Sequence, residues 1–287
     1  MHKKNLSYLY EVFNLPFSSD FCLNGFKESV LNPEFHISSR KLLPKYQLNT
    51  EPSKLNHTFG YIQNKDFIFQ IENGAQILYS QRNKCGLGSK IAKIFHQPLA
   101  YLLFQKDFFV FHGSSFSFNG NAIILSGLSG SGKSETIRAL SDKYKFISDD
   151  IVAAKISKNK VVCPSGLPFI CSEKSGKHKI GDKRDRKIFF VDRNKIEEKE
   201  LKLGMVIFLK WSDEYSFHEL SDKEIFSEIL ANSFRPLPSA ENNRSQRKYL
   251  KDISRIINFT KFYVFNRPKG SIEESLKQLI KFINDRN

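Results

Sequence analysis

The stretch Gly127-Leu128-Ser129-Gly130-Ser131-Gly132-Lys133-Ser134 decides the fold, because it matches the phosphate-binding pattern G-x-x-x-x-G-K-[ST] at every position. The glycines let backbone N–H groups surround a phosphate. Lys133 can reach the β- and γ-phosphates of a nucleotide, and the Ser134 hydroxyl can ligate Mg²⁺. A helix that begins at this point adds the positive end of its dipole. The stretch therefore predicts a phosphate-binding loop.

The residues on both sides of this loop agree with the prediction. Residues 122–125 form a short apolar run that ends just before the loop, which is typical of a buried strand. Residues 135–140 are helix formers, with Ile137 and Leu140 three positions apart. A strand before the loop and a helix after it are the context in which this pattern binds phosphate. The alternative is a Gly/Ser-rich turn that binds nothing.

The composition is that of a folded protein with a sizeable core. The chain has 287 residues, of which 40% are hydrophobic and 27 are phenylalanines. This length fits one large domain or two smaller ones. No apolar stretch approaches the length of a membrane-spanning helix, and the N-terminal segment is too polar for a signal peptide. Four cysteines are scattered without a C-x-x-C pair, so we expect reduced thiols and a cytoplasmic location.

The formal net charge of +15 favours anionic partners such as nucleotides, acidic peptides, nucleic acid or a membrane surface. Positive charge gathers in residues 174–187, and a second basic group comprises Arg244, Arg247, Lys248 and Lys251. A generally lysine-rich composition is the alternative explanation. No helix-turn-helix, zinc-finger or RNA-recognition pattern occurs in the sequence, so nucleic acid is not an expected partner.

Regular elements are predicted mainly after residue 58. Residues 1–60 look irregular, because prolines and polar residues interrupt them. Residues 59–80 alternate and contain turn signals, which predicts short antiparallel strands. Residues 89–104 have helical spacing, with a kink or break expected at Pro98. Asn119-Gly120 then predicts the type I′ turn of a hairpin that leads into the loop.

After the loop helix, the pattern predicts further strands and helices up to the C-terminus. The predicted strands cover residues 144–148, 152–156, 161–163, 203–209 and 262–265. The predicted helices cover residues 222–233, 244–258 and 271–283. The last of them carries a Ser271-x-x-Glu274 capping box. This mixture predicts an α/β (α+β) fold with a mixed sheet around the loop.

Two polar groups near the loop suggest chemistry as well as binding. Asp149-Asp150 follow a predicted strand, where a phosphate-loop fold holds Mg²⁺ with a carboxylate. Adjacent acids at a strand end point in different directions, so one can serve the metal while the other accepts a hydroxyl proton. An acidic turn or a helix N-cap is the alternative. His112-Gly113 lies one strand before the loop strand, where a lone histidine is more often structural than catalytic.

Residues 108–150 resemble the kinase domain of HPr kinase/phosphorylase and its relatives, which share a nucleotide-binding core with phosphoenolpyruvate carboxykinase. Four elements carry the resemblance in matching order and approximate spacing: His112-Gly113, the Asn119-Gly120 hairpin, the loop with Glu135-Thr136 after it, and Ser148-Asp149-Asp150. The resemblance implies a mixed sheet with a phosphate loop in residues 91–287.

The resemblance also implies roles for individual residues. Asp149 would accept the proton of a serine hydroxyl and Asp150 would hold the metal together with Ser134, or the two aspartates would exchange roles. His112 would lie near the γ-phosphate or a second metal, Lys133 would act on the phosphoryl group, and Glu135 would support the water shell of the metal. The residues implied to bind ATP are Gly127, Ser129, Gly130, Ser131, Gly132, Lys133, Ser134 and Glu135. The basic residues implied to neutralise the transferred phosphoryl group are Lys177, Lys183, Arg184 or Lys187.

Departures from the family limit what carries over. The Gly- and Asn-containing signature that follows the paired aspartates in true HPr kinases does not occur here, and the N-terminal third does not resemble their regulatory domain. HPr as substrate and the reverse phosphorylase reaction are therefore not implied. The chain is more similar to HPr-kinase-like proteins that modify other alcohols, including kinases that act on a terminal serine of a lasso-peptide precursor.

The resulting hypothesis is a kinase that uses ATP and Mg²⁺ to phosphorylate a serine-type hydroxyl of a peptide, a protein or a small metabolite. The alternative is a nucleotide-binding regulator or assembly factor without phosphoryl transfer. A decarboxylating carboxykinase is a poorer alternative, because the chain is short for that class. We expect residues 1–90 to form a small α+β cap that helps build the acceptor site, and homo-oligomers are common among relatives of this family.

Overall fold

The computed structural model of this chain describes residues 7–41, 58–172, 179–183, 186–234 and 243–286. The first part is a seven-stranded sheet with the strand order β3-β1-β2-β4-β7-β6-β5, which mixes parallel and antiparallel pairs. Its strands are β1 (Tyr8–Val12), β2 (Leu15–Ser19), β3 (Lys27–Glu28), β4 (Phe35–Ser39), β5 (Phe59–Gln63), β6 (Phe67–Glu72) and β7 (Gln76–Gln81). The predicted strands in residues 59–80 are confirmed.

The prediction that residues 1–60 are irregular is wrong, because β1–β4 lie there. These strands are short, and both parallel pairs of the sheet, β2–β4 and β4–β7, join strands that do not follow one another along the chain. Their stability comes from packing across the sheet. Phe17 of β2 and Phe35 of β4 are fully buried and stack with ring centroids 4.9 Å apart. Such contacts between strands give no local periodic signal.

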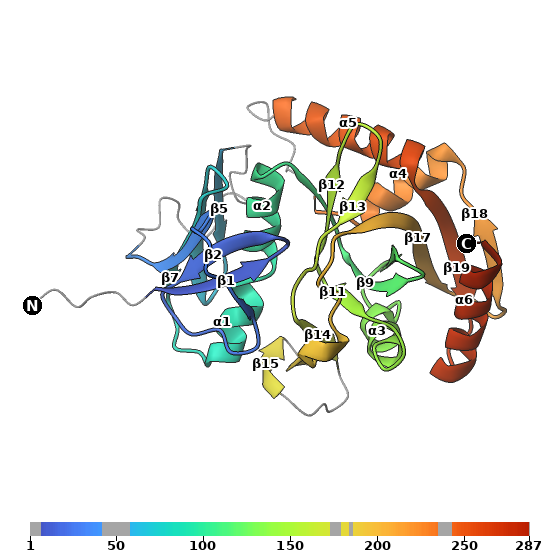
Figure 1. Cartoon of the computed structure of the whole chain (residues 1–287), viewed down its shortest axis with the longest axis horizontal. Coiled ribbons are helices and arrows are strands. Elements are labelled where there is room, and N and C mark those ends of the chain that lie inside the picture. Colours follow the sequence, from blue (N-terminus) through green and yellow to red (C-terminus); the bar gives the residue numbers. More distant parts are fainter. Residues whose placement is uncertain (1–6, 42–57, 173–178, 184–185, 235–242, 287) are drawn as a thin grey trace, which may run out of the picture.

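Helices α1 (Leu87–Ile94) and α2 (Gln97–Gln105) pack beside this sheet, on the side that faces the rest of the chain (Figure 1). Pro98 lies in the first turn of α2, so the predicted break between two helical segments is confirmed. The core of the sheet includes Phe95 and Leu99 of this helical pair and continues to Val110 and Ile151. The hydrophobic core is therefore shared by residues on both sides of position 90.

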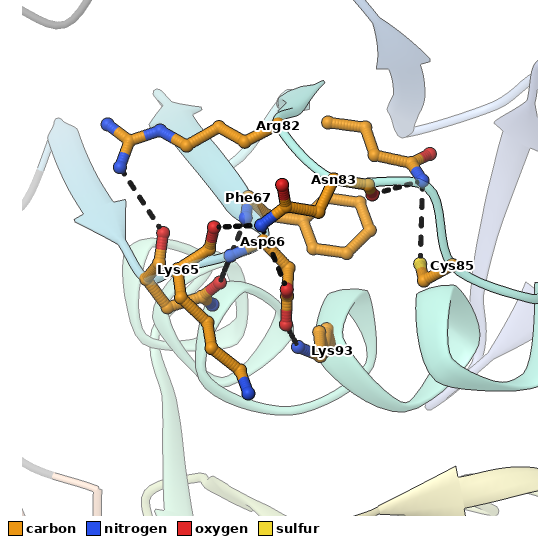
Figure 2. Close-up of polar contacts among 9 residues, drawn as sticks. Lys65, Asp66, Phe67, Arg82, Asn83, Cys85 and Lys93 are labelled. Carbon is orange, nitrogen blue, oxygen red and sulfur yellow. Dashed lines mark hydrogen bonds and ion pairs between the residues drawn. The ribbon is translucent and has the colours of Figure 1, made fainter.

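Polar contacts tie the turn between β5 and β6 to helix α1 (Figure 2). Lys93 of α1 donates to the Asp66 carboxylate, and this hydrogen bond holds the pKa of Asp66 below its usual value. Asn83 donates to the carbonyl oxygen of Lys65 at 2.9 Å, and Arg82 donates to the side chain of Gln63 at 3.1 Å. These bonds hold the chain at the point where it leaves the sheet and enters α1.

The second sheet has nine strands, and the glycine-rich loop follows one of them, β10. One path through it runs β11-β9-β10-β17-β13-β12-β8, and β19 pairs with β17 and with β18. Its strands are β8 (Phe108–Phe111), β9 (Gly113–Phe118), β10 (Asn121–Ser126), β11 (Phe146–Asp149), β12 (Val152–Ile156), β13 (Val161–Cys163), β17 (Leu201–Trp211), β18 (Ser216–Glu219) and β19 (Lys261–Arg267). Asn119 and Gly120 have φ of 46° and 76°, so the predicted hairpin turn between β9 and β10 is confirmed.

Helices cover both faces of this second sheet (Figure 1). Alternate residues of the central strands face opposite ways, so Ile124 packs with α4 (Asp222–Ala231) and α5 (Asn243–Phe259), whereas Ile123 packs with α3 (Lys133–Leu140) and α6 (Ile272–Arg286). The helices predicted after the loop are confirmed. The observed class is mixed α/β with mixed sheets, as predicted. A small third sheet contains β14 (Phe169–Ser172), β15 (Lys179–Lys183) and β16 (Arg186–Phe190).

The β1–β2 turn docks the first sheet on the second. Phe13 has φ of 54°, is 1% exposed, and donates its N–H to the carbonyl oxygen of Ser165 at 2.7 Å. The next residue, Gly166, in turn donates to Ile147 of β11. The first sheet is therefore anchored beside the strand that ends at Asp149. The predicted division into residues 1–90 and 91–287 stays a prediction.

Two further sequence expectations concern the whole chain. In the described part of the chain, no helix is both long and apolar enough to cross a membrane. Cys22, Cys85 and Cys163 are free cysteines, and of these three only Cys163 is buried. Burial raises the pKa of the Cys163 thiol, so that side chain packs as a neutral core residue.

Candidate functional site

The glycine-rich loop lies at the edge of the second sheet where several strands end. β17 runs parallel to β10 and to β19, and β11 runs in the same direction because both β11 and β10 are antiparallel to β9. The carboxyl ends of these four strands therefore meet at one edge. They carry Asp149 (β11), the loop 127–134 (β10), Trp211 (β17) and Arg267 (β19). In open α/β sheets, this edge is where ligands bind.

The loop has a backbone that only glycine adopts at low cost. Gly127, Gly130 and Gly132 have φ of 136°, 85° and 83°. A Cβ atom on Gly127 would lie 2.7 Å from the carbonyl oxygen of Leu209, and one on Gly132 would collide with the guanidinium of Arg267. The glycines of the pattern are thus required by the neighbouring strands β17 and β19 as well as by the shape of the loop.

Two side chains of the loop point to what it could bind. The Nζ atom of Lys133 donates to the carbonyl oxygens of Gly127 at 2.6 Å and Leu128 at 3.0 Å, so it lies across the loop. The Ser131 hydroxyl is buried and has no hydrogen-bond partner among the described residues. A buried hydroxyl without a partner costs about 1–3 kcal/mol, which a ligand oxygen could recover.

Asp149 is the centre of a buried cluster of oxygen atoms. Its side chain is 1% exposed, and its Oδ1 atom accepts hydrogen bonds from Ser114 Oγ at 2.5 Å and Ser134 Oγ at 3.3 Å. Ser134 is the last residue of the loop pattern, so the loop and the predicted acid do meet. Ser114 was not predicted. Its only signal is the register of β9, in which it pairs with Asp149.

Asp150 lies beside two histidines. His96 Nε2 is 3.3 Å from one carboxylate oxygen of Asp150, and His112 Nδ1 is 3.6 Å from the other. His112 Nδ1 also lies 3.1 Å from the backbone oxygen of Asp150, which has φ of 70°. The ring of Phe234 contacts both imidazoles edge-on. His112 was predicted, whereas His96 comes from the α1–α2 connection and carried no sequence signal.

A magnesium ion is implied by the family resemblance, and the oxygen cluster can be tested for it. Mg²⁺ uses one or two carboxylates, a hydroxyl and the oxygens of a bound phosphate instead of a full protein cage. The Ser134 hydroxyl and the Asp149 carboxylate are such donors and are in contact. Within the described residues, no group of three or more His, Cys, Asp or Glu side chains could hold a metal ion. This donor set suits a metal bound together with phosphate.

The other flank of the loop is built from Trp211 and Arg267, neither of which was predicted. Arg267 is 1% exposed and donates to Thr136 Oγ1 at 3.1 Å and to the carbonyl oxygen of Ser131 at 2.8 Å. Its guanidinium carbon lies 4.8 Å from the centroid of the Trp211 ring, and Trp211 Nε1 donates to the carbonyl oxygen of Gly130 at 2.9 Å. Together they bond to Gly130 and Ser131 of the loop and to Thr136 of the helix that follows it.

The positive charge of Arg267 is compensated by the negative charge of Glu135 without a direct ion pair among the described residues. In the described part of the chain, this guanidinium forms no ion pair with a carboxylate, and its Nε atom has no hydrogen-bond partner. Burial lowers the pKa of Arg267, and the charge of Glu135 acts in the opposite direction. Glu135 lies in the first turn of α3, directly after the loop. An anion bound to the loop would add to this compensation.

The predicted basic segment is described in part. Lys177 and Arg184 lie outside the described residues. Lys183 belongs to β15, which contacts α1, and Lys187 belongs to β16, whose partner strand β14 contacts α3 and β11. One edge of this small sheet, β14, is therefore beside the loop helix, and the other edge, β15, is beside α1. The proposed contact of these basic residues with phosphate stays a prediction.

Comparisons with known proteins give a distant similarity. No protein-family model matches the chain, and no curated protein matches it. Among solved structures, the chain is similar to the Hpr(Ser) kinase/phosphatase from Coxiella burnetii. The match covers 61% of this chain and 98% of that chain, with 13% sequence identity and a TM-score of 0.35. Membership of the HPr kinase family stays a prediction, and function is inferred from the residues of the site.

Proposed function

We propose that this chain is a kinase that uses ATP and Mg²⁺ to transfer the γ-phosphoryl group to a serine-type hydroxyl of a peptide, a protein or a small metabolite. The observation that carries the proposal is the contact between the last residue of the loop and the strand-end acid, with Ser134 Oγ 3.3 Å from Asp149. In a phosphate-loop enzyme, a loop hydroxyl and a strand-end aspartate are the two protein groups that hold the metal.

Binding of the triphosphate would use the loop backbone and two of its side chains. Lys133 would turn from the carbonyl oxygens of Gly127 and Leu128 to the β- and γ-phosphates, which are stronger acceptors for an ammonium group. The unpartnered hydroxyl of Ser131 would gain a phosphate oxygen as its partner. The N-terminus of α3 adds a favourable dipole for the same negative charge.

The metal and the proton acceptor are assigned to different aspartates. We assign Asp149 to Mg²⁺ together with Ser134, which exchanges the roles first considered for the two acids. When bound, Mg²⁺ would neutralise charge on the phosphate oxygens. Asp150 is assigned as the proton acceptor, because its carboxylate is 16% exposed and can meet a substrate, whereas Asp149 is enclosed by two hydroxyls.

The transfer step then involves few protein groups. The acceptor hydroxyl oxygen attacks the γ-phosphorus, the bond from that phosphorus to the bridging oxygen breaks, and ADP leaves with the bonding electrons. The hydroxyl proton passes to the Asp150 carboxylate. His96 and His112 contact that carboxylate and would orient it, and His112 is also assigned near the γ-phosphate. Catalysis of this kind is mostly positioning and charge stabilisation.

The proposal is tested by incubating the full chain with ATP, Mg²⁺ and two acceptor pools, one of serine-containing peptides and one of small alcohols. Mass spectrometry should find a phosphorylated acceptor. Lys133→Ala should lower transfer at least about a hundred-fold. The matched control is Lys143→Ala, an exposed lysine that follows the end of α3.

Transfer at the wild-type rate by Lys133→Ala would refute the proposal. ATP binding by the wild-type chain without transfer to any acceptor would instead favour the alternative, a nucleotide-binding regulator or assembly factor. The two functions are therefore separated by measuring binding and transfer on the same preparation.

A further inference from the structure

Trp211 has an unusual position for a large apolar side chain. It is the only tryptophan in the chain, and it lies at the carboxyl end of β17, directly beside the loop. It is 42% exposed, and Leu128 on the loop itself is 68% exposed. Two large apolar side chains thus face solvent at an otherwise polar site, which marks them as candidate ligand contacts.

The indole is held in place from two sides. Its Nε1 atom donates to the carbonyl oxygen of Gly130 at 2.9 Å, and the guanidinium of Arg267 lies 4.8 Å from its ring centroid. Arg267 is itself fixed by its bonds to Ser131 and Thr136. Trp211 therefore keeps an exposed aromatic surface at a set position relative to the loop, without losing rotamer freedom when a ligand binds.

The strand directions indicate what that surface would meet. If the loop holds the triphosphate, the rest of the nucleotide must lie along the edge formed by the carboxyl ends of the parallel strands. On the β11 side of the loop, the buried Asp149 and the Asp150 carboxylate make that edge acidic. On the β17 side, the edge offers an aromatic ring and a cation. A planar base suits the second side and not the first.

We propose that the exposed indole of Trp211 is the platform on which the base of the bound nucleotide stacks, with Leu128 as a second apolar contact. This inference rests on the proposed binding of a triphosphate by the loop. It adds a base subsite and gives Trp211 a role other than holding Gly130. Stacking on an aromatic side chain tolerates different bases, so the platform contributes affinity for nucleotides as a class.

The experiment compares ATP with inorganic tripolyphosphate by calorimetric titration of the full chain. Trp211→Leu should weaken ATP binding about ten-fold or more and change tripolyphosphate binding less than about two-fold. Trp211→Phe should keep most of the ATP affinity, because it keeps an aromatic ring and loses only the bond to Gly130. Phe226→Leu, at an exposed aromatic residue of α4, is the matched control and should change neither affinity.

Equal weakening of ATP and tripolyphosphate in Trp211→Leu would overturn the inference, because Trp211 would then only support the loop. Emission of the single tryptophan gives a second readout, which should change more with ATP than with tripolyphosphate. A wild-type chain that binds neither compound would refute both the base platform and the proposed function. ATP binding that is weakened in Trp211→Leu, with no phosphoryl transfer by the wild type, would refute the kinase and leave the platform standing.

Discussion

The two flanks of the glycine-rich loop differ in chemistry although both stand at the same edge of one sheet. On the β11 side, Asp149 accepts bonds from two serine hydroxyls, and Asp150 lies against two histidines. On the β17 side, Arg267 and Trp211 bond to the loop backbone and to each other. One flank collects groups that accept protons or bind a cation, and the other collects groups that fix the loop and carry positive charge.

Different strands therefore fix the shape of the loop and provide its candidate reactive groups: β17 and β19 fix the loop, and the acids lie at the end of β11. A rigid flank holds backbone donors in place, which lowers the reorganisation needed when an anion binds. The acidic flank, under the proposed function, places carboxylate oxygens where Mg²⁺ would bind and where the acceptor hydroxyl would lose its proton. Changes on the β11 side should therefore affect transfer more than binding or stability, whereas changes on the β17 side should affect stability and binding first.

Asp149→Asn should have the largest effect. The amide keeps the size of the side chain and an oxygen that can accept from Ser114 and Ser134, but it removes the negative charge assigned to Mg²⁺. We expect transfer to fall about a thousand-fold while the circular dichroism spectrum stays that of the wild type. Asp213→Asn, at an exposed acid after β17, is the control. Normal transfer by Asp149→Asn would show that the β11 flank is not the catalytic one.

Asp150→Asn should separate binding from transfer. The assigned proton acceptor is lost, so transfer should fall about a hundred-fold, whereas ATP affinity measured by calorimetry should stay within about two-fold. If ATP affinity fell as much as transfer, Asp150 would serve the nucleotide or its metal, and the assignment of the two aspartates would have to be exchanged again.

Arg267→Met should act mainly on stability. It leaves Thr136 and the carbonyl oxygen of Ser131 without their donor and removes the cation beside Trp211. We expect the free energy of unfolding, measured in urea, to fall by about 2–3 kcal/mol. Arg286→Met is the matched control, because Arg286 is exposed near the C-terminus, and its effect should stay within about 0.5 kcal/mol. Equal effects of the two substitutions would contradict the structural role of the β17 flank.

Ser114→Ala should give the smallest effect. It removes one of the two hydroxyls that donate to Asp149 and should lower transfer about ten-fold, as expected for one hydrogen bond to a charged group. Ser117→Ala, three residues further along β9 and half-buried, is the control and should leave transfer unchanged. An equal response to both substitutions would mean that β9 acts only through its stability.

Much of the local structure could be predicted from the sequence. The strand β10, the helix α3 and the turn at Asn119-Gly120 follow from hydrophobic spacing and from residues that tolerate positive φ. The strands β1–β4 could not, because they are short and depend on stacked rings such as Phe17 and Phe35, which come from different strands.

Only some residues of the candidate site could be predicted from the sequence. The loop, His112 and the paired aspartates carry recognisable patterns, whereas His96, Trp211 and Arg267 do not. Arg267 is 131 residues away from Thr136, its hydrogen-bond partner. No local pattern can indicate such a contact, because it depends on β19 being parallel to β17 and on β17 being next to β10.

The sequence by itself determined that a glycine-rich loop with a lysine and a serine stands between a strand and a helix, since these properties depend on neighbouring residues only. The tertiary structure decided which residues surround that loop. It brought Asp149 to Ser134, put Asp150 between two histidines, and assigned Trp211 and Arg267 to the opposite flank. The physical reason is that strand order and register bring together groups that are far apart in the chain, and both are set by the packing of the whole core.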